Sequence, residues 1–384
     1  METADMKAAD LKTADVNVAD FHVADFHAAA FRSADRWRRK LATALLASAG
    51  MGLAAGAMAA APAPYAITPE LVTAATAEKK VVFYTSTDVA VAQGLAQEFQ
   101  KEYPGITVQV ERSGSERVFQ RLGQEYSTGI HNADVIETSD AVNFVYFKQQ
   151  GWLRPMVPKI VADKWPASAR DADGYYAAYR AHLSVMAYNT TLMKDADAPK
   201  TWTDLLDPRY KGKMVKAHPG YSGTIMTSTY ILSQLLGWEY FEKLGKQDIM
   251  QVQSSTEPPK KLAEKERALQ VDGNEYNIFR LQDQGVPLKI VYPPEGTPIA
   301  IGNAGVLKDA PHPNAAKLFY AFIFSTQAQQ INSDTGGLRS FNPDVKEKAS
   351  RTPLSSIKVL NSDPVKVLPQ IQTIKSNYEK YFGT

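Results

Sequence analysis

The sequence predicts an α/β protein with two packed cores. The chain has 384 residues and 44% of them are hydrophobic, which is enough for two cores of ordinary size. Short apolar runs rich in β-branched residues alternate with segments of amphipathic helical periodicity. This alternation is typical of parallel sheets flanked by helices, and proline and glycine mark the boundaries between the segments.

The first half of the globular part is predicted to be a helix followed by repeated strand–helix pairs. Thr68 is the expected cap of the first helix, with Pro69 at its first helical position. The expected strands are 81–86, 106–114 and 133–140, and each of the last two is preceded by a turn signal such as Pro104-Gly105. Each strand leads directly into an amphipathic helix, so a parallel sheet is expected.

The second half continues the alternation with longer strands. A strand-like crossing is expected over 177–193, and a helix, a turn and a strand follow within 201–217. A helix begins near residue 223, and strands return within 288–309. The last strong helix ends at Gly336-Gly337, and the tail from residue 345 is expected to be helical and to wrap the surface.

Composition narrows the functional classes. The chain has 43 basic and 41 acidic residues, a net charge of +2, which gives no general argument for binding nucleic acid or an anionic membrane. Cysteine is absent, so disulfides, thiol catalysis and thiolate metal sites are excluded. The sequence also lacks the common hydrolase, zinc-protease and nucleotide-binding motifs, and the serine-rich stretch 113–117 has no placed base.

Two unlike segments precede the globular part. Residues 1–35 repeat an Ala-Asp pair every five residues and resemble pentapeptide repeats, but they are too few for the several stacked coils that such a fold needs. We expect this segment to be absent from the mature protein. Residues 36–60 have a basic start, an apolar stretch and an Ala-x-Ala cleavage site at 57–59, as in a signal peptide. Arg38-Arg39 leaves export by Sec or Tat open, and either route predicts a periplasmic protein.

Five sequence motifs occur in an order that is similar to a known family. They are VVFYTSTD, Tyr188-Asn189, PKTWTDLLDPRYKGK, YSGT and FSTQAQQI. Over residues 67–384 the chain resembles the bacterial solute-binding proteins of ABC importers, in the group that binds ferric iron, 2-aminoethylphosphonate or polyamines. The resemblance implies a monomer without enzymatic activity or cofactor, whose partners are a small solute and an inner-membrane permease.

The resemblance also implies a two-lobed type II periplasmic binding protein fold with two hinge crossings. Residues 67–180 form the first part of lobe 1, residues 181–292 form lobe 2, and residues 293–384 return to lobe 1 and add C-terminal helices. From the strands, the crossings are expected near 179–184 and 292–297.

Candidate cleft residues come from the loops that follow strands and open helices. Ligands of α/β sheets lie beyond the carboxyl ends of the strands, where helix N-termini offer free N–H groups to anions. For several of these residues, simple helix capping is an equally good interpretation. The candidates are Thr85, Ser86, Thr87, Ser113, Ser139, Asp140, Ser222, Gly223 and Thr224.

The segment GNEYNIFR, residues 273–280, decides between two ligand classes. The resemblance implies that iron binders supply two adjacent tyrosines here, but this chain has Glu275 and Tyr276, with Asn274 before them. Ferric iron prefers phenolate, carboxylate and imidazole ligands. The reduced set therefore favours a small anionic or zwitterionic solute of phosphonate, phosphate or carboxylate type. Ferric iron held by Glu275, Tyr276 and a bound anion is the alternative, and a periplasmic hydrolase is a further one.

Overall fold

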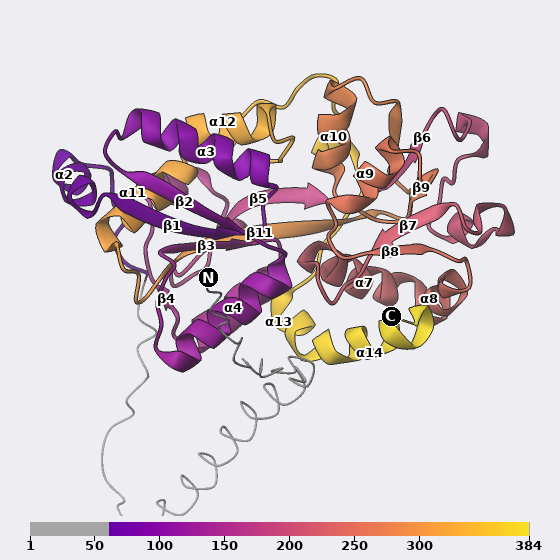
Figure 1. Ribbon diagram of the computed structural model, residues 1–384, viewed down its shortest axis with the longest axis horizontal. Coiled ribbons are helices and arrows are strands. Elements are labelled where there is room, and N and C mark those ends of the chain that lie inside the picture. Colours follow the sequence, from indigo (N-terminus) through magenta and orange to yellow (C-terminus); the bar gives the residue numbers. More distant parts are fainter. Residues whose placement is uncertain (1–60, 384) are drawn as a thin grey trace, which may run out of the picture. The chain divides into compact units, whose positions relative to one another are not determined.

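The computed structural model describes residues 61–383 (Figure 1). The pentapeptide-like repeat and the signal peptide expected in residues 1–60 therefore lie outside the described residues. Within the described part, no helix combines the length and apolarity needed to span a membrane. The helices and strands form two separate sheets with their own helical layers.

The first sheet has seven strands, in the order β12-β11-β3-β1-β2 with β4 and β5 paired to β11. Strands β1, β2 and β3 run parallel, so their carboxyl ends meet at one edge, whereas β11 is antiparallel to β3. Its strands are β1 (Lys80–Thr85), β2 (Thr107–Arg112), β3 (Val135–Thr138), β4 (Leu153–Arg154), β5 (Ala177–Leu183), β11 (Thr297–Leu307) and β12 (Val359–Leu360).

Helices cover both faces of this sheet. One face packs an aromatic cluster between helices α3 and α11, in which the ring of Phe99 meets the rings of Phe319 and Phe322 edge-on. The other face buries Tyr84, Phe144 and Phe147 against α4 and α5. The helices are α2 (Pro69–Glu78), α3 (Val89–Glu102), α4 (Ser115–Thr128), α5 (Ala141–Gln149), α6 (Lys159–Lys164), α11 (Pro313–Ile323) and α12 (Thr326–Asp334).

The second sheet has five strands in the order β10-β6-β9-β7-β8. Trp202 is fully buried in its core, and the indole Nε1 donates to the carbonyl of Gly296 at 2.9 Å. The strands are β6 (Met186–Asn189), β7 (Met214–Ala217), β8 (Met250–Val252), β9 (Leu269–Gln270) and β10 (Leu288–Val291). The helices are α7 (Gly223–Leu236), α8 (Trp238–Gly245), α9 (Glu257–Ala263) and α10 (Glu275–Asp283).

Two crossings join the lobes. The chain leaves the first sheet at the end of β5 and enters the second at β6, so the first crossing is at residues 184–185, at the end of the expected 179–184. It returns between β10 and β11, over residues 292–296. The C-terminal part contacts both lobes. Strand β12 pairs with the first sheet, but α14 (Ile371–Phe382), which follows the short α13 (Pro364–Val367), packs on α7 and α8.

Candidate ligand-binding cleft

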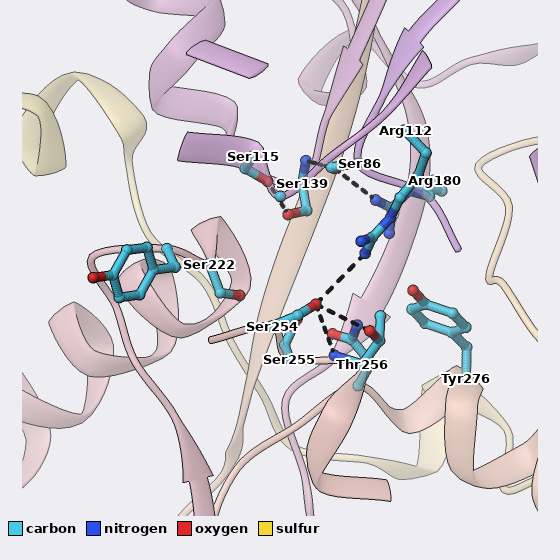
Figure 2. Close-up of a pocket in the computed structure, with 13 residues that line it drawn as sticks. Ser86, Arg112, Ser115, Ser139, Arg180, Ser222, Ser254, Ser255, Thr256 and Tyr276 are labelled. Carbon is cyan, nitrogen blue, oxygen red and sulfur yellow. Dashed lines mark hydrogen bonds between the residues drawn. The ribbon is translucent and has the colours of Figure 1, made fainter. Parts of the chain in front are cut away.

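A small cavity lies where the two lobes meet (Figure 2). The space there that is not filled by protein atoms is about 260 Å³, and part of it is open to solvent. Its lining comes from the loops after β1, β2 and β3, from β5, from the starts of α7 and α10, and from the loop after β8. The lining residues are Ser86, Arg112, Gly114, Ser115, Ser139, Arg180, Tyr221, Ser222, Ser254, Ser255, Thr256, Asn274 and Tyr276.

Three serines from consecutive strand–helix loops form the first-lobe wall. Ser86 Oγ accepts from the backbone N–H of Ser139 at 2.8 Å, and the hydroxyls of Ser139 and Ser115 share a hydrogen bond of 2.6 Å. Because β1, β2 and β3 are parallel, their following loops converge at one sheet edge, which brings these hydroxyls together. Each hydroxyl can still donate or accept with a ligand, because a hydroxyl has one donor and two acceptor positions.

Arg180 is a buried cation behind this wall. It lies on β5, and its Nε donates to Glu137 Oε1 at 3.0 Å, while Nη2 donates to Ser86 Oγ at 3.3 Å. Thr85 and Thr87 also donate hydroxyl hydrogen bonds to Glu137, at 2.6 and 3.0 Å. The carboxylate is thus fully hydrogen-bonded and fixes the guanidinium in place.

His182 connects Arg180 to the second lobe. Arg180 Nη1 donates to His182 Nδ1 at 3.1 Å, and since a guanidinium cannot accept, Nδ1 is the acceptor. The proton of the neutral ring is therefore on Nε2, which donates to Thr224 Oγ1 on α7 at 2.8 Å. Burial, with a further contribution from Arg180, holds the pKa of His182 well below its usual value, so the imidazole is neutral near pH 7.

Arg112 is the second cation of the cavity and is much less engaged. Its Nε donates to the Thr87 carbonyl at 3.4 Å and its Nη2 to Ser254 Oγ at 3.5 Å, both long for hydrogen bonds. None of the carboxylates in residues 61–383 forms an ion pair with it, and none lines the cavity. Arg112 therefore gives the cavity a positive charge that the described protein groups do not neutralise.

The second-lobe wall is also rich in hydroxyls and helix starts. Ser222 caps α7, where its Oγ accepts from the N–H of Ile225 at 3.5 Å. Ser254, Ser255 and Thr256 form a turn after β8, in which Ser254 and Thr256 share a hydroxyl hydrogen bond of 3.0 Å. Figure 2 shows this turn facing Arg112 across the cavity.

Helix α10 places an amide and a phenol at the cavity. Asn274 is the residue before α10 and is 3% exposed, and Tyr276 is 1% exposed. The Arg180 guanidinium lies 5.9 Å from the Tyr276 ring centroid, within the range of a cation–π contact. Burial raises the pKa of Tyr276, so its hydroxyl is protonated near neutral pH and can donate a hydrogen bond.

The model of one protein family, the bacterial extracellular solute-binding proteins, matches residues 94–356, more than half of the chain. The chain belongs to this family. Members of the family are substrate-binding proteins of transporters, and this chain is a solute-binding protein.

Individual relatives of this solute-binding protein agree with that assignment. A probable ABC transporter periplasmic-binding protein of Sinorhizobium fredii is 22% identical over 69% of this chain and 76% of its own length. An Fe(3+)-binding periplasmic protein of Serratia marcescens is 26% identical over 67% of this chain and 77% of its own length. The chain spans only 52% of a relative from Haemophilus influenzae that is 28% identical.

Solved structures agree on the fold. The periplasmic binding protein AfuA from Actinobacillus pleuropneumoniae, with exogenous fructose-6-phosphate bound, has a TM-score of 0.72 to this solute-binding protein. The two are 24% identical over 79% of this chain and 98% of AfuA, so the likeness shows the shared fold alone. The two-lobed type II fold expected from the sequence is confirmed.

The structure brings some of the predicted site residues to the cavity. They are Ser86, Ser139, Ser222, Asn274 and Tyr276. Thr85 and Thr87 instead hold Glu137, and Thr224 binds His182, so these three lie behind the lining. Ser113 faces a neighbouring hollow that it shares with Arg112 and Arg121.

Asp140 and Gly223 lie beside the cavity and pack against each other across the lobes. A Cβ on Gly223 would lie 2.4 Å from Asp140 Cβ, so only glycine allows this approach. Asp140 Oδ1 caps α5 by accepting from the N–H of Val142 at 3.0 Å. Burial raises the pKa of Asp140 to about 7.

Glu275 does not reach the cavity, contrary to the expectation that it meets the ligand. It is fully buried and accepts from Arg339 Nε and Nη2, both at 2.8 Å, and from the Tyr292 hydroxyl at 2.5 Å. Adjacent residues of a helix point about 100° apart, so Tyr276 faces the cleft while Glu275 faces the C-terminal segment. Long-range pairing with Arg339 could not be read from the local sequence.

The turn of Ser254, Ser255 and Thr256 is the part of the lining that the sequence reasoning missed. It follows a short strand and, unlike the loops at 113–115 and 222–224, contains no glycine. The other lining residues outside the predicted set are Arg112, Gly114, Ser115, Arg180 and Tyr221. The cluster of Ser, Ser and Thr before a helix with Glu257 in its first turn was the available signal.

The lobes contact each other around the cavity. Arg117 donates to Gln253 Oε1 at 2.6 Å, and Arg280 Nη1 on α10 lies 2.9 Å from Asp88 Oδ1 at the start of α3. Together with the contact of Asp140 and Gly223, these pairs describe a closed arrangement, because each joins a residue of the first lobe to one of the second.

Proposed function

We propose that this protein captures a small organic oxyanion in the cleft and delivers it to the permease of an ABC importer. The observation that carries the proposal is the chemistry of the lining. Two guanidinium groups and nine hydroxyl-bearing residues surround the cavity, whereas no carboxylate of residues 61–383 lines it. Such a set of donors is suited to phosphonate, phosphate or carboxylate oxygens.

The mechanism is capture by closure. The open lobes bind the solute, and bridging contacts from Arg112 and Ser222 then favour the closed arrangement, since a ligand shifts an equilibrium toward the state that it contacts better. The closed form docks on the permease. We further propose that the protein is exported to the periplasm by Sec or Tat and acts as a monomer. No residue is assigned a catalytic role, and no cofactor is needed.

Ferric iron is the second candidate, because Tyr276 lines the cleft and an iron-binding relative matches two thirds of the chain. Against it, Glu275 is occupied by Arg339, and residues 61–383 contain no cluster of three His, Asp or Glu side chains placed to hold a metal ion. Tyr276 with a bound anion would then have to supply most of the ligands, and both neighbouring cations would disfavour Fe(III).

The proposal is tested with a thermal-shift screen followed by a titration. Phosphonates, phosphates and small carboxylates should raise the melting temperature by mass action. Fe(III), added as a citrate complex, should produce no tyrosinate charge-transfer band in the visible. A strong band, without stabilisation by any oxyanion, would show that iron is the cargo.

A further inference from the structure

One polar atom of the cleft has no partner. Asn274 Oδ1 is buried and accepts no hydrogen bond from any group in residues 61–383. Among the buried unpaired side-chain atoms of that part, it is the one whose residue lines the cavity. An asparagine at a helix start ordinarily caps the helix, but this side chain makes no capping bond to α10. Buried acceptors are almost always paired, so a donor is expected from the ligand.

The unpaired acceptor contrasts with the rest of the lining. Arg112 and Arg180 can only donate hydrogen bonds, and the hydroxyl groups can rotate to donate. These groups are therefore the donors that bind the oxyanion. An oxyanion oxygen placed against Asn274 Oδ1 would be repelled and would leave the acceptor unsatisfied. The group that meets Asn274 is therefore a second group of the same ligand, and it carries an N–H or O–H.

Charge decides between an ammonium and a hydroxyl. Three carboxylates near the cleft are paired with arginines, Glu137 with Arg180, Glu275 with Arg339 and Asp88 with Arg280. The fourth, Asp140, caps α5 by accepting from the N–H of Val142, and burial raises its pKa to about 7. An ammonium would enter a cavity that already contains the unneutralised Arg112, and it would lose its hydration without gaining a counter-ion. Removing a neutral hydroxyl from water costs much less free energy than removing an ammonium.

We infer that the cargo is a hydroxylated oxyanion, whose hydroxyl donates to Asn274 Oδ1 while its anionic group is held by the arginines and serines. The inference rests on the proposed function and makes its ligand class narrower. It separates hydroxylated phosphonates, phosphates or carboxylates from their amino counterparts, which the sequence alone did not distinguish.

Calorimetric titration with three matched probes tests the inference. The probes are 2-hydroxyethylphosphonate, ethylphosphonate and 2-aminoethylphosphonate, at neutral pH and fixed salt. The hydroxyl compound should bind about tenfold more tightly than the ethyl compound, because the latter leaves the acceptor unpaired. The amino compound should bind most weakly. Tightest binding of the amino compound would overturn the inference.

Two variants of Asn274 assign the preference to this side chain. Asn274→Ala should bring the hydroxyl and ethyl compounds within about twofold of each other, because the acceptor is gone. Asn274→Asp places a carboxylate at the same point and should make 2-aminoethylphosphonate the preferred probe. Thermal melts without ligand check that each variant folds, and Asn274→Ser replaces any variant that does not. A preference of about tenfold for the hydroxyl over the ethyl compound that persists in folded Asn274→Ala would also overturn the inference.

The outcomes separate this inference from the proposed function. A parallel series of 3-hydroxypropanoate, propanoate and β-alanine covers the case in which the anionic group is a carboxylate. If members of either series bind without a preference for the hydroxyl, the inference fails and oxyanion capture stands. If no member of either series binds, the proposed function itself fails.

Discussion

Arg112 is the residue on which the charge of the cleft depends. Its two hydrogen bonds are long, at 3.4 and 3.5 Å, and a ligand oxyanion would be its first charged partner among the described residues. We predict that Arg112→Gln weakens oxyanion binding by roughly tenfold to hundredfold, the value of one charge-assisted hydrogen bond. Calorimetry measures the effect. Arg154→Gln, an exposed arginine on β4, is the control and should bind as the unchanged protein does.

Glu275 is predicted to act on stability. If Glu275 contacted the ligand, as the sequence predicts, Glu275→Gln should weaken the binding of a cationic ligand. In the structure this carboxylate instead accepts hydrogen bonds from Arg339 and Tyr292. Removing one partner of a buried ion pair costs about 3–5 kcal/mol, and Arg339 keeps Glu347, so about 3 kcal/mol is expected. Denaturant unfolding measures it. Unchanged stability combined with a large loss of affinity would place Glu275 in the ligand contact after all.

At the scale of elements, the buried cap of α5 predicts a pH dependence. Burial raises the pKa of Asp140 to about 7, with Glu116 raising it and Lys375 lowering it, whereas in the unfolded chain the value is about 3.9. The folded state therefore binds this proton more tightly, so the stability contribution is present below about pH 4 and is lost as the pH rises through about 7.

Asp140→Asn should keep the cap of α5 and remove this pH dependence of the folding stability. Melting curves from pH 5 to 8 should show the unchanged protein losing stability relative to the variant as the pH rises. Parallel curves for the two proteins would contradict the assignment. The capping bond to the N–H of Val142 can be retained by an asparagine oxygen, so a general loss of helix stability is not expected.

The sequence predicted the elements better than the contacts between them. The strands 81–86 and 133–140 and the helix start near Ser222 follow local rules of periodicity, capping and turn formation, and the structure has them nearly in place. The pairing of Glu275 with Arg339 joins residues 64 apart in the chain, and the packing of α14 on the second lobe is likewise long-range. Contacts between distant residues produce no periodic pattern in the sequence, so neither contact could be predicted from local patterns.

At the scale of the whole molecule, closure brings Asp88 and Arg280 together. Their side chains are 12% and 22% exposed and lie 2.9 Å apart, and they belong to different lobes. We predict that Asp88→Asn, which keeps the cap on α3, speeds ligand release by about fivefold and leaves association nearly unchanged, because the pair forms only on closure. Stopped-flow kinetics measures both rates.

A double-variant cycle isolates this pair. Asp88→Asn combined with Arg280→Gln should release ligand no faster than either single variant, since the interaction is lost in each. Glu242→Gln, which removes the surface pair with Lys246 at the end of α8, serves as the control. Additive effects of the two cleft variants would mean that the residues act separately.

The central claim is that the cleft binds an oxyanion between the lobes. Its most direct test is a calorimetric titration of the protein with 2-hydroxyethylphosphonate, repeated with Arg112→Gln. The account predicts one saturable site in the unchanged protein and an affinity roughly tenfold or more weaker in the variant. Equal affinities in the two proteins, or no binding of any oxyanion beside tight binding of Fe(III), would contradict it.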